Sequence, residues 1–577
     1  MNKKIRIVIF VIACLSIALT LGKILNPLDP RMFNFHDDTQ AARIEQMTVN
    51  LKSGHIPPRL APTISYGLGF PVFNFYAPFS YQITTGFHLL GMSIPMALKF
   101  SFFLSVVLSF VTMFLLLQTF FGFLPSILGG IAYASSLWFA VEIFVRGNLA
   151  ECWFLVLFPL SLYLLVLNAR KSSKYLIAFS VLIITFTLTV HNVFSLLSLV
   201  IFSLFILFFK NKKRNFFILI LGLLLSSYFL IPALSELKLT YAAQNAMRAH
   251  YEDHFLCVEQ IWSSLKWEYS GSTAGCTDDG MPFILGKIHI VLGTFGMIIF
   301  LFDLFNKKIK KFASKKASLF ILILTGLSLF MTTYQSAFIW GILSSVLALF
   351  QFPWRFLVFG MFGFAYFSAY LFNRLELRYA RIAFVSVIIV IILLLFTSTK
   401  FFSKPWLMSY DEYANAYMSE NYISRTVAYN MAEYLPRTAN YDYWRSFDSQ
   451  IHPGKDLLVG VTQNAPVEIQ DISLIKIVKN DPFSKIVSIN KPSEIKINIH
   501  YFPFWEIKIN GVRIIPNKFD LLGRPIVILS QPSTIAITYK ETFLETISNI
   551  ISLIALIIIG MLIFYKPLWN KLKPLLK

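Results

Sequence analysis

Long apolar runs separated by short polar segments dominate the chain. A run of about 17–25 apolar residues can cross the hydrocarbon core of a bilayer as a helix, because only a helix satisfies its backbone hydrogen bonds within lipid. The sequence contains about twelve such runs, and each predicts a transmembrane helix. The predicted helices cover residues 5–24, 97–120, 124–140, 149–168, 175–190, 192–209, 216–234, 286–305, 317–334, 353–373, 380–399 and 543–565.

Basic residues gather in six clusters beside these runs. The clusters are Lys3, Lys4 and Arg6; Arg170, Lys171 and Lys174; Lys210, Lys212, Lys213 and Arg214; the lysines of residues 307–316; Arg374, Arg378 and Arg381; and Lys566, Lys571, Lys573 and Lys577. Because Lys and Arg favour the cytoplasmic side, we expect all six clusters and both termini there. This topology requires the apolar stretches 73–92 and 335–352 to lie at the outer interface without crossing.

Composition supports the membrane assignment and excludes other classes. Of the 577 residues, 56% are hydrophobic and only 14% are charged, with a mean hydropathy of +0.64. A soluble chain carries about 25% charged residues, so a water-soluble, disordered, collagen-like or cysteine-stapled protein is excluded. The net charge of +21 would suggest nucleic acid as a partner. Since the six clusters account for all of this excess, they face membrane lipid and nucleic acid is excluded.

The first apolar run has an alternative interpretation. Three basic residues followed by an apolar stretch are also typical of a cleavable signal peptide. The run is long, and no small-x-small cleavage pattern precedes Gly22, so we favour an uncleaved first helix.

This topology divides the chain into three domains. Residues 1–399 form a helical transmembrane domain with outer loops at 27–96 and 235–285, residues 400–542 form an extracytoplasmic domain, and residues 543–577 form a last helix with a basic cytoplasmic tail. From about residue 469 the outer domain shows short β-type runs at 485–489, 494–500, 505–509, 526–529 and 534–539. Asn510-Gly511 predicts a hairpin turn. We therefore expect a mainly α polytopic protein with a β-sandwich-like outer domain.

The four cysteines divide into two pairs. Cys14 and Cys152 fall within predicted membrane helices, where a thiol behaves as a small hydrophobe. Cys257 and Cys276 share the second outer loop, where an oxidising compartment permits a disulfide, and the sequence leaves open whether they form one. No CxxC or HExxH motif indicates a metal site.

The densest polar constellation follows the first helix. It begins with His36, Asp37 and Asp38 and continues with Arg43, Glu45, Lys52, His55 and Arg59. A carboxylate partly withdrawn from water has a raised pKa and can accept a proton from a hydroxyl, so Asp37 or Asp38 is a candidate general base. The alternative is that Asp38 is the N-cap residue of a helix, and the sequence does not separate the two.

Three further sets of polar residues lie at the predicted outer boundary. Arg146 and Glu151 are candidates for ligand binding, although Arg146 could instead pair with Glu142 or Glu151. His191 could act at a site, although a histidine that only satisfies a helix turn is the more frequent case. In the run Phe352-Pro353-Trp354-Arg355, Trp354 is typical of an interface belt, while Arg355 is equally suited to grip a lipid phosphate.

The order of these elements resembles the GT-C class of membrane glycosyltransferases. The resemblance rests on a short basic N-terminus, one helix, an outer loop with the acidic motif, the run 54–59, and a Pro- and Tyr-rich interfacial segment. Within that class the chain is similar to bacterial membrane proteins labelled "6-pyruvoyl-tetrahydropterin synthase-related", through residues 146–151, 191–192 and 352–355. Residues 501–505 and 510–511 resemble the terminal β-domain of YfhO-type proteins, with Phe504 and Asn510 departing from that pattern.

The resemblance implies a multi-pass protein of the bacterial cytoplasmic membrane that moves a sugar from a polyprenyl-phosphate carrier to an envelope polymer or lipid acceptor. Asp37 or Asp38 would be the base of an inverting transfer, and Arg59, Arg146 or Arg355 would hold the departing phosphate. His36, His55, Glu151 and His191 complete the predicted substrate site. Some members of the class hold a divalent cation at the acidic motif, so Asp37 and Asp38 are its candidate ligands, although this sequence does not require one.

A second hypothesis is a non-catalytic envelope protein or a transporter that binds lipid-linked saccharides. Transporters usually place ionisable residues and broken helices at the middle of the membrane. Here the ionisable residues gather at the outer boundary, which favours chemistry at the interface.

Overall fold

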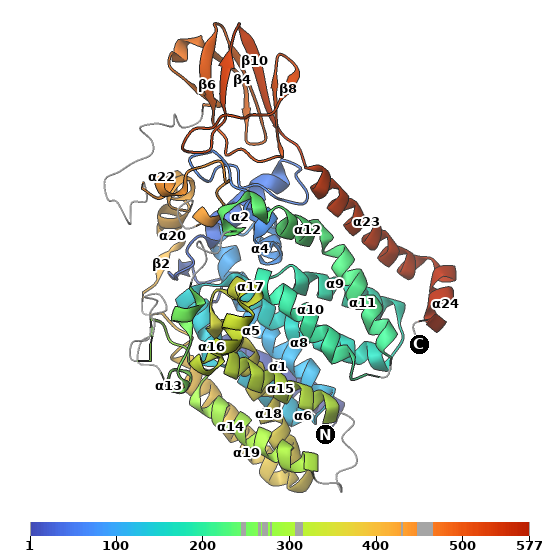
Figure 1. Ribbon diagram of the computed structural model, residues 1–577. Helices are drawn as coiled ribbons and strands as arrows, with labels where there is room; N and C mark the ends of the chain where they lie inside the picture. Colours follow the sequence, from blue (N-terminus) through green and yellow to red (C-terminus); the bar gives the residue numbers. More distant parts are fainter. Residues whose placement is uncertain are drawn as a thin grey trace.

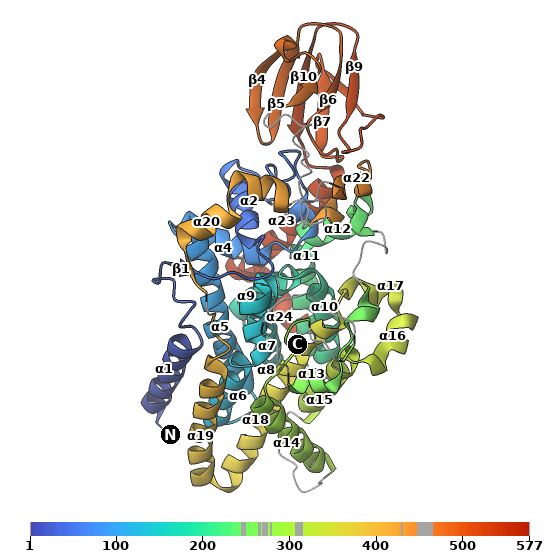
Figure 2. The same cartoon turned by 90° about the vertical axis from the view of Figure 1, so that its left-hand side faces the viewer.

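The computed structural model describes residues 2–209, 211–243, 250–263, 267, 275–276, 280–305, 315–404, 406–427, 431–446 and 465–575. Long helices form the lower layer in Figure 1, a middle layer contains shorter helices, and two β-sheets lie at the far end. The view turned by 90° in Figure 2 shows the same three layers. The sheets therefore lie beyond the middle layer, and one long helix, residues 543–564 at the right in Figure 1, runs from them down beside the other helices.

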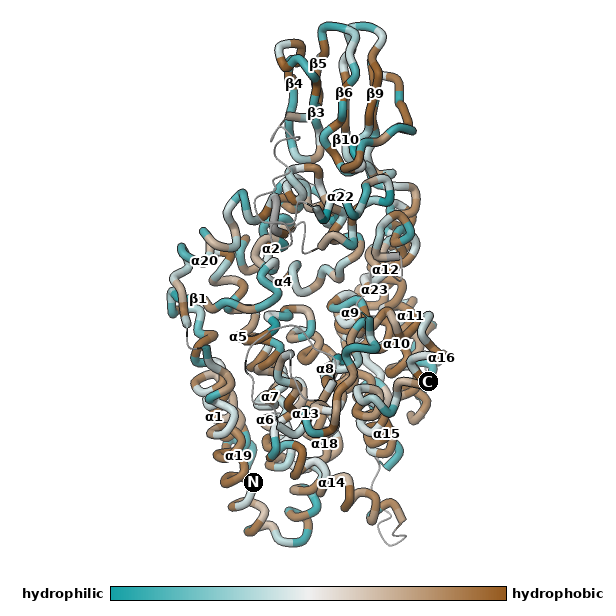
Figure 3. The backbone as a smooth tube through the Cα atoms, turned by 60° about the vertical axis from the view of Figure 1, so that its left-hand side comes forward, coloured by the Kyte–Doolittle hydropathy of each residue, from teal (hydrophilic) through white to brown (hydrophobic). Residues whose placement is uncertain are grey.

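The lower layer is built from helices whose sequences are apolar on nearly every side. Its elements are α1 (Lys3–Thr20), α5 (Ile94–Gln118), α6 (Phe123–Ala134), α7 (Leu137–Ala140), the π-helix η1 (Val141–Arg146), α8 (Leu149–Arg170), α9 (Lys174–Leu188), α10 (Asn192–Ile206), α11 (Lys212–Leu225), α12 (Ser227–Ser235), α14 (Lys287–Phe305), α15 (Lys315–Thr332), the 3-10 turn η8 (Pro353–Phe356), α18 (Leu357–Arg378), α19 (Ala380–Thr399) and α23 (Phe543–Phe564). Hydrophobic residues predominate along these helices in Figure 3, whereas hydrophilic residues are frequent in α20 and β4.

In the described part of the chain, eight helices are long and apolar enough to cross a membrane, or nine if the bent pair α11 and α12 counts as one span. The chain is thus a multi-pass membrane protein, but the predicted count of about twelve spans is not confirmed. All twelve runs form helices. However, α9 and α10 have only 15 residues each, α1 carries three basic residues in its first turn, and α11 and α12 are bent by 64°.

The two stretches expected at the interface do not form spanning helices. Residues 73–92 fall in α3 (Val72–Phe75) and α4 (Phe79–Leu89), and residues 335–352 fall in short turns that include α16 (Ala337–Ile342) and α17 (Ser344–Leu347). Two of the six basic clusters contact neighbouring helix ends, while Lys210, most lysines of 307–316 and Lys577 lie outside the described residues. The side chain of Arg170 donates to the Thr119 carbonyl at 2.9 Å, and Arg214 donates to the Lys171 carbonyl at 3.0 Å.

The middle layer brings together the first outer loop and the tyrosine-rich part of the outer domain. Its elements are α2 (Gln40–Lys52), α3, α4, α20 (Tyr410–Tyr417), the π-helix η9 (Tyr422–Thr426), η10 (Ala432–Tyr434) and α22 (Tyr441–Arg445), whereas α13 (Val258–Trp262) of the second outer loop lies lower, among the long helices (Figure 1). The two-residue strands β1 (Arg31–Met32) and β2 (Met408–Ser409) pair antiparallel and join these two parts of the sequence.

The C-terminal region is β-rich, as predicted. One sheet has the order β4-β5-β10-β7-β8 and the other β3-β6-β9, and every pairing is antiparallel. The strands are β3 (Val467–Ile469), β4 (Ile475–Asp481), β5 (Ser484–Ile489), β6 (Ser493–Ile497), β7 (Trp505–Ile509), β8 (Val512–Ile514), β9 (Ile526–Leu529) and β10 (Ser533–Tyr539). Apolar residues from both sheets share one core. From β10 the chain enters α23, which is followed by α24 (Lys566–Leu575).

Candidate active site

The acidic motif lies against the backbone that precedes α8. The His36 N–H donates to the Val145 carbonyl at 3.0 Å, and the Asp37 N–H donates to the Arg146 carbonyl at 2.8 Å. The N-cap residue of α2 is Thr39, and its side chain makes no capping hydrogen bond. Asp38 is therefore not the N-cap residue, and the motif is held by a contact with a distant part of the sequence.

The run Arg146-Gly147-Asn148 forms the joint between η1 and α8. Gly147 adopts a left-handed conformation with φ of 69°, which favours glycine, and its carbonyl accepts a hydrogen bond from Gln40 Nε2 at 2.9 Å. Asn148 is the N-cap of α8, where its side chain accepts from the Glu151 N–H at 3.1 Å. Because π-helical turns often occur at functional sites, this joint is a natural place for chemistry.

A buried ion cluster surrounds Glu151. Its Oε1 lies 3.0 Å from Arg146 Nη1, 3.5 Å from His191 Nε2 and 3.6 Å from Arg355 Nε. Arg146 also donates to Glu142 at 2.6 Å, and its guanidinium lies 4.5 Å from the centre of the Trp354 ring. The structure thus joins four residues from three separate sets in the sequence, together with Glu142.

Two of these residues also have a local role in the backbone. His191 is the N-cap of α10, and its ring nitrogen accepts from the Phe194 N–H at 3.4 Å. Arg146 is held by both glutamates that were its alternative partners in the sequence. The ion-pair and helix-turn interpretations therefore describe real contacts, and they do not prevent these residues from belonging to a site.

Arg43, on α2, lies close enough to the acidic motif for its charge to act on Asp37 and Asp38. Its Nη1 donates to Tyr81 Oη at 2.7 Å, and that hydroxyl donates to Gln40 Oε1 at 2.7 Å. The guanidinium lies 4.2 Å from the centre of the Tyr76 ring. Arg43 belongs to the polar constellation seen in the sequence but not to the predicted site; the available signal was a charged residue between the small and apolar positions of α2.

The two adjacent carboxylates have opposite electrostatic environments. Burial alone would raise the pKa of Asp37, but the hydrogen bond with His36 and the positive charges of Arg146 and Arg43 outweigh it, so this pKa is lowered. Burial raises the pKa of Asp38, helped by the charge of Asp37 and opposed by Tyr422 and His36. Neighbouring acids whose pKa values are pushed apart suit different roles. The side chains of His36 and Asp37 remain 46% and 35% exposed, so a substrate can reach the motif.

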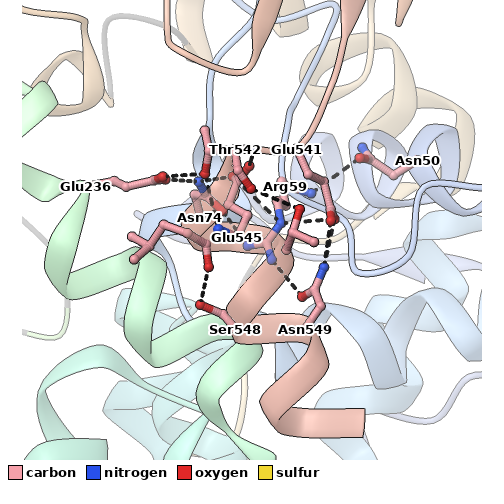
Figure 4. Close-up of polar contacts among 11 residues, drawn as sticks. Asn50, Arg59, Asn74, Glu236, Glu541, Thr542, Glu545, Ser548 and Asn549 are labelled. Carbon is pink, nitrogen blue, oxygen red and sulfur yellow. Dashed lines mark hydrogen bonds and ion pairs between the residues drawn. The ribbon is translucent and has the colours of Figure 1, made fainter.

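Arg59 and His55 lie in different surroundings. Arg59 is 2% exposed and donates to Asn74 at 2.7 Å and to Asn549 at 2.8 Å (Figure 4). The His55 ring lies 3.9 Å from the ring of Phe483. The helix α2, about 20 Å long from its 13 residues, separates both from the acidic motif. The structure does not bring these two predicted residues together with Asp37 and Asp38.

The remaining predictions concern cysteines and metals. Cys257 and Cys276 form a disulfide with their Cα atoms 5.6 Å apart. Asp37 and Asp38 offer oxygen ligands of the kind that a hard divalent cation prefers. Among the residues that the structure describes, however, no group of three or more His, Cys, Asp or Glu side chains could hold a metal ion.

No protein-family model and no curated protein matches the chain. Among solved structures, the mycobacterial arabinofuranosyltransferase AftD is similar over 69% of this chain, with 14% identity and a TM-score of 0.44. The oligosaccharyltransferase of Archaeoglobus fulgidus is similar over 80% of it, with 14% identity and a TM-score of 0.37. The chain spans only 26% of the length of AftD and 59% of that oligosaccharyltransferase. At these TM-scores, the likenesses decide neither the family nor the activity of this chain.

Proposed function

We propose that this chain is a membrane glycosyltransferase that moves a sugar from a polyprenyl-phosphate carrier to an envelope acceptor on the outer face. The observation that carries the proposal is the juxtaposition of Asp37 and Asp38 with the Arg146, Glu151 and Arg355 cluster through the backbone contact at Arg146. A base beside a phosphate-binding group at the membrane boundary is what such a transfer requires.

Asp38 is the better candidate for the base. Its raised pKa makes it the stronger proton acceptor of the two, whereas Asp37 is held ionised beside His36 and near Arg146. The negative charge of Asp37 then contributes to the raised pKa of Asp38 and helps to position it.

Arg355 is the better candidate for the phosphate ligand. Arg146 is already paired with two glutamates, and Arg59 is enclosed by two asparagines and two glutamates. Arg355 Nη1 donates to the Phe350 carbonyl at 2.8 Å, which fixes its direction, while its only carboxylate contact among the described residues is Glu151 at 3.6 Å.

In the proposed step, the acceptor hydroxyl loses its proton to a carboxylate oxygen of Asp38 as its oxygen forms a bond to the anomeric carbon. The bond between that carbon and the phosphate oxygen breaks, and the bonding electrons leave with the polyprenyl phosphate. Arg355 stabilises the charge that develops there. A phosphate leaving group needs little protonation, so no general acid is required, and displacement from the opposite side inverts the anomeric configuration.

Separate Asp37→Asn and Asp38→Asn variants test the base. Replacing the base should abolish envelope glycosylation in cells at normal protein levels, because the amide cannot accept the proton. Asp481→Asn is the control, since Asp481 is 61% exposed in the distant strand β4 and should have no effect. Full glycosylation with both variants would contradict the proposed function.

Arg355→Lys tests the phosphate ligand. Lysine keeps the charge but cannot form the bidentate contact, so we expect kcat to fall by about 10²- to 10³-fold, as for loss of one oxyanion-stabilising donor. Arg59→Lys is the comparison; a larger loss of kcat there than at Arg355 would move the phosphate site to the Arg59 cluster.

A further inference from the structure

Three basic segments that are distant in the sequence meet at one side of the helical layer. The Lys174 side chain donates to the Ile563 carbonyl, which joins the beginning of α9 to the end of α23. Arg214 donates to the Lys171 carbonyl at 3.0 Å, which joins the beginning of α11 to the connection between α8 and α9. The connection between α8 and α9, the beginning of α11 and the end of α23 with α24 therefore lie together.

These three segments carry many basic residues and no acidic one. The sequence contains no Asp or Glu in residues 164–180, 205–220 and 555–577. We call the described basic residues of the three segments the basic patch. The basic patch consists of Arg170, Lys171, Lys174, Lys212, Lys213, Arg214, Lys566, Lys571 and Lys573.

Acidic residues on other helices at this level of the chain are engaged elsewhere. Asp303, near the end of α14, lies 2.6 Å from Arg374 of α18. Glu376, also on α18, lies beside Gly122 at the beginning of α6. Neither contact involves a residue of the basic patch, so the patch keeps its positive charge.

Most of the basic patch is open to a partner. Seven of its nine side chains are exposed, Lys174 is half-buried, and only Arg214 is buried. Like charges held this close repel one another, and the repulsion is relieved when an anion binds between them. An anionic partner therefore fits the patch by charge.

Exposed apolar side chains lie directly beside these charges. Tyr175, which follows Lys174, is 63% exposed, and Phe564, which follows Ile563, is 85% exposed. The Lys174 ammonium lies 5.0 Å from the centre of the Tyr175 ring. A free phosphate ester would leave these rings in water, whereas a phospholipid supplies a phosphate for the lysines and acyl chains for the rings.

The helix α24 has the pattern of a helix that lies in the surface of a membrane. Leu568, Trp569 and Leu572 are partly buried against the main core of the protein, whereas its three lysines are exposed. Such a helix places its apolar side toward the interior and its lysines among anionic headgroups.

We propose that the basic patch is a binding site for an anionic phospholipid, whose phosphate lies among the lysines of α9, α11 and α24. The acyl chains of this lipid lie along Tyr175 and Phe564, and its headgroup fixes α24 along the membrane surface. The lipid thus holds the far end of α23, the helix that begins at the Arg59 cluster. Because α9 is about 22 Å long and ends three residues before His191, this site is separate from the candidate active site.

The first test measures the affinity of the full chain for two phospholipids. The chain in an uncharged detergent is titrated with phosphatidylglycerol or with phosphatidylcholine, and native mass spectrometry measures the tightest-bound lipid. We expect selective binding of phosphatidylglycerol. The triple variant Lys566→Gln, Lys571→Gln, Lys573→Gln should weaken it about 10²-fold, since each lysine near an anionic surface contributes about fivefold. The same three positions changed to arginine should keep the affinity within about twofold, because each charge is retained.

A second triple variant controls for the loss of net charge. Lys3→Gln, Lys4→Gln, Arg378→Gln removes the same number of exposed charges from α1 and α18, outside the basic patch, and should leave the affinity unchanged. An equal loss of affinity in the two variants, or equal affinity of the wild type for both lipids, would overturn the proposal.

The second test distinguishes a lipid from a free phosphate ester. Phosphatidylglycerol should raise the melting temperature of the wild type but not that of the Lys566, Lys571 and Lys573 variant, because a ligand that binds only the folded state stabilises it. Glycerol 3-phosphate, which has the phosphate but no acyl chains, should raise neither at the same concentration. An equal rise with glycerol 3-phosphate would identify a site for a soluble phosphate ester and overturn the lipid assignment. None of these outcomes depends on the proposed glycosyl transfer.

Discussion

At the residue scale, Gly147 determines whether the acidic motif can approach the ion cluster. Its φ is +69°, and a Cβ added there would lie 2.0 Å from Cδ2 of Phe35, the residue before His36. We expect Gly147→Ala to displace Phe35 and the motif behind it, and to reduce transfer activity by at least about 10²-fold, the effect of misplacing a catalytic group by about 1 Å. Initial rates at saturating acceptor measure this.

Gly54→Ala is a matched control for that prediction. Gly54 has a φ of +79° but nothing within 4 Å of the added Cβ, so the variant imposes the same backbone strain without the clash. Equal losses of activity in the two variants would show that strain alone is responsible.

Arg146 supports the buried cluster through its two glutamates. Glu142 and Glu151 are both fully buried, so Arg146→Gln leaves them without their main counter-ion. We expect destabilisation by about 3–5 kcal/mol, seen as a lower melting temperature of the purified protein. The double variant Arg146→Gln, Glu142→Gln should recover part of the loss, because His191 and Arg355 still contact Glu151. A double variant no more stable than the single one would contradict this account.

At the scale of elements, the cluster around Arg59 connects the first outer loop to α12 and α23. Asn74 Nδ2 donates to Glu236 at 2.9 Å and to Glu545 at 2.7 Å, while Asn549 on α23 accepts from Arg59 (Figure 4). Thr542 Oγ1 donates to Glu236 at 2.8 Å. The beginning of α23 is therefore tied to the loop that carries the candidate active site.

The cluster should respond to pH through Glu236. Burial and the charge of Glu545 raise its pKa from 4.5 to about 7, against the effects of Thr542 and Arg59. Between these two values the folded state binds more protons than the unfolded state, so this group's contribution to stability falls as pH rises from about 4.5 to about 7 and is constant above. The full change in the free energy of unfolding is about 3 kcal/mol.

The measurement is the difference in melting temperature between the wild type and Glu236→Gln, followed from pH 5 to pH 8. Glu236→Gln imitates the protonated acid, so it should stabilise the chain at pH 8 relative to the wild type and match it near pH 5. Glu494→Gln, at a side chain 54% exposed in β6, should follow the wild-type curve. Parallel curves for the wild type and Glu236→Gln would contradict the assignment.

The sequence predicted the long helices and the inner strands better than it predicted helix lengths and the outermost strands of the sheets. The positive φ angles at Asn510 and Gly511 fit the predicted hairpin turn between β7 and β8. The strands β3, β4 and β8 were not predicted, and β4 is almost entirely exposed, so its apolar residues do not alternate between a core and solvent. Helices were predicted from hydrophobicity, which does not register the bend between α11 and α12 or the short lengths of α9 and α10.

At the scale of the whole molecule, the composition of the candidate site was more predictable than its grouping. The residue type and a position at the predicted membrane boundary were enough to select Arg146, Glu151, His191 and Arg355. That three of them contact the carboxylate of the fourth, Glu151, depends on how α8, α10 and η8 pack. Proximity in sequence misleads at Arg59, because α2 carries it away from the acidic motif. The tyrosines near Asp38 come from residues 410–426, whose contact with the first outer loop depends on the pairing of β1 with β2.

The orientation of the whole molecule in the membrane is the last prediction. We propose that the layer with the acidic motif faces outward and the basic helix ends face the cytoplasm, since the basic clusters then follow the positive-inside rule. Ser53→Cys, exposed at the end of α2, should react with a membrane-impermeant maleimide in intact cells, whereas Lys571→Cys, exposed on α24, should react only after permeabilisation. The parent chain gives the background, which should be low because Cys152 is buried, Cys257 is bonded to Cys276, and the partly buried Cys14 lies within the apolar helix α1, out of reach of a charged maleimide. The reverse labelling pattern would place the acidic motif inside the cell, where the proposed transfer to an outer acceptor could not occur.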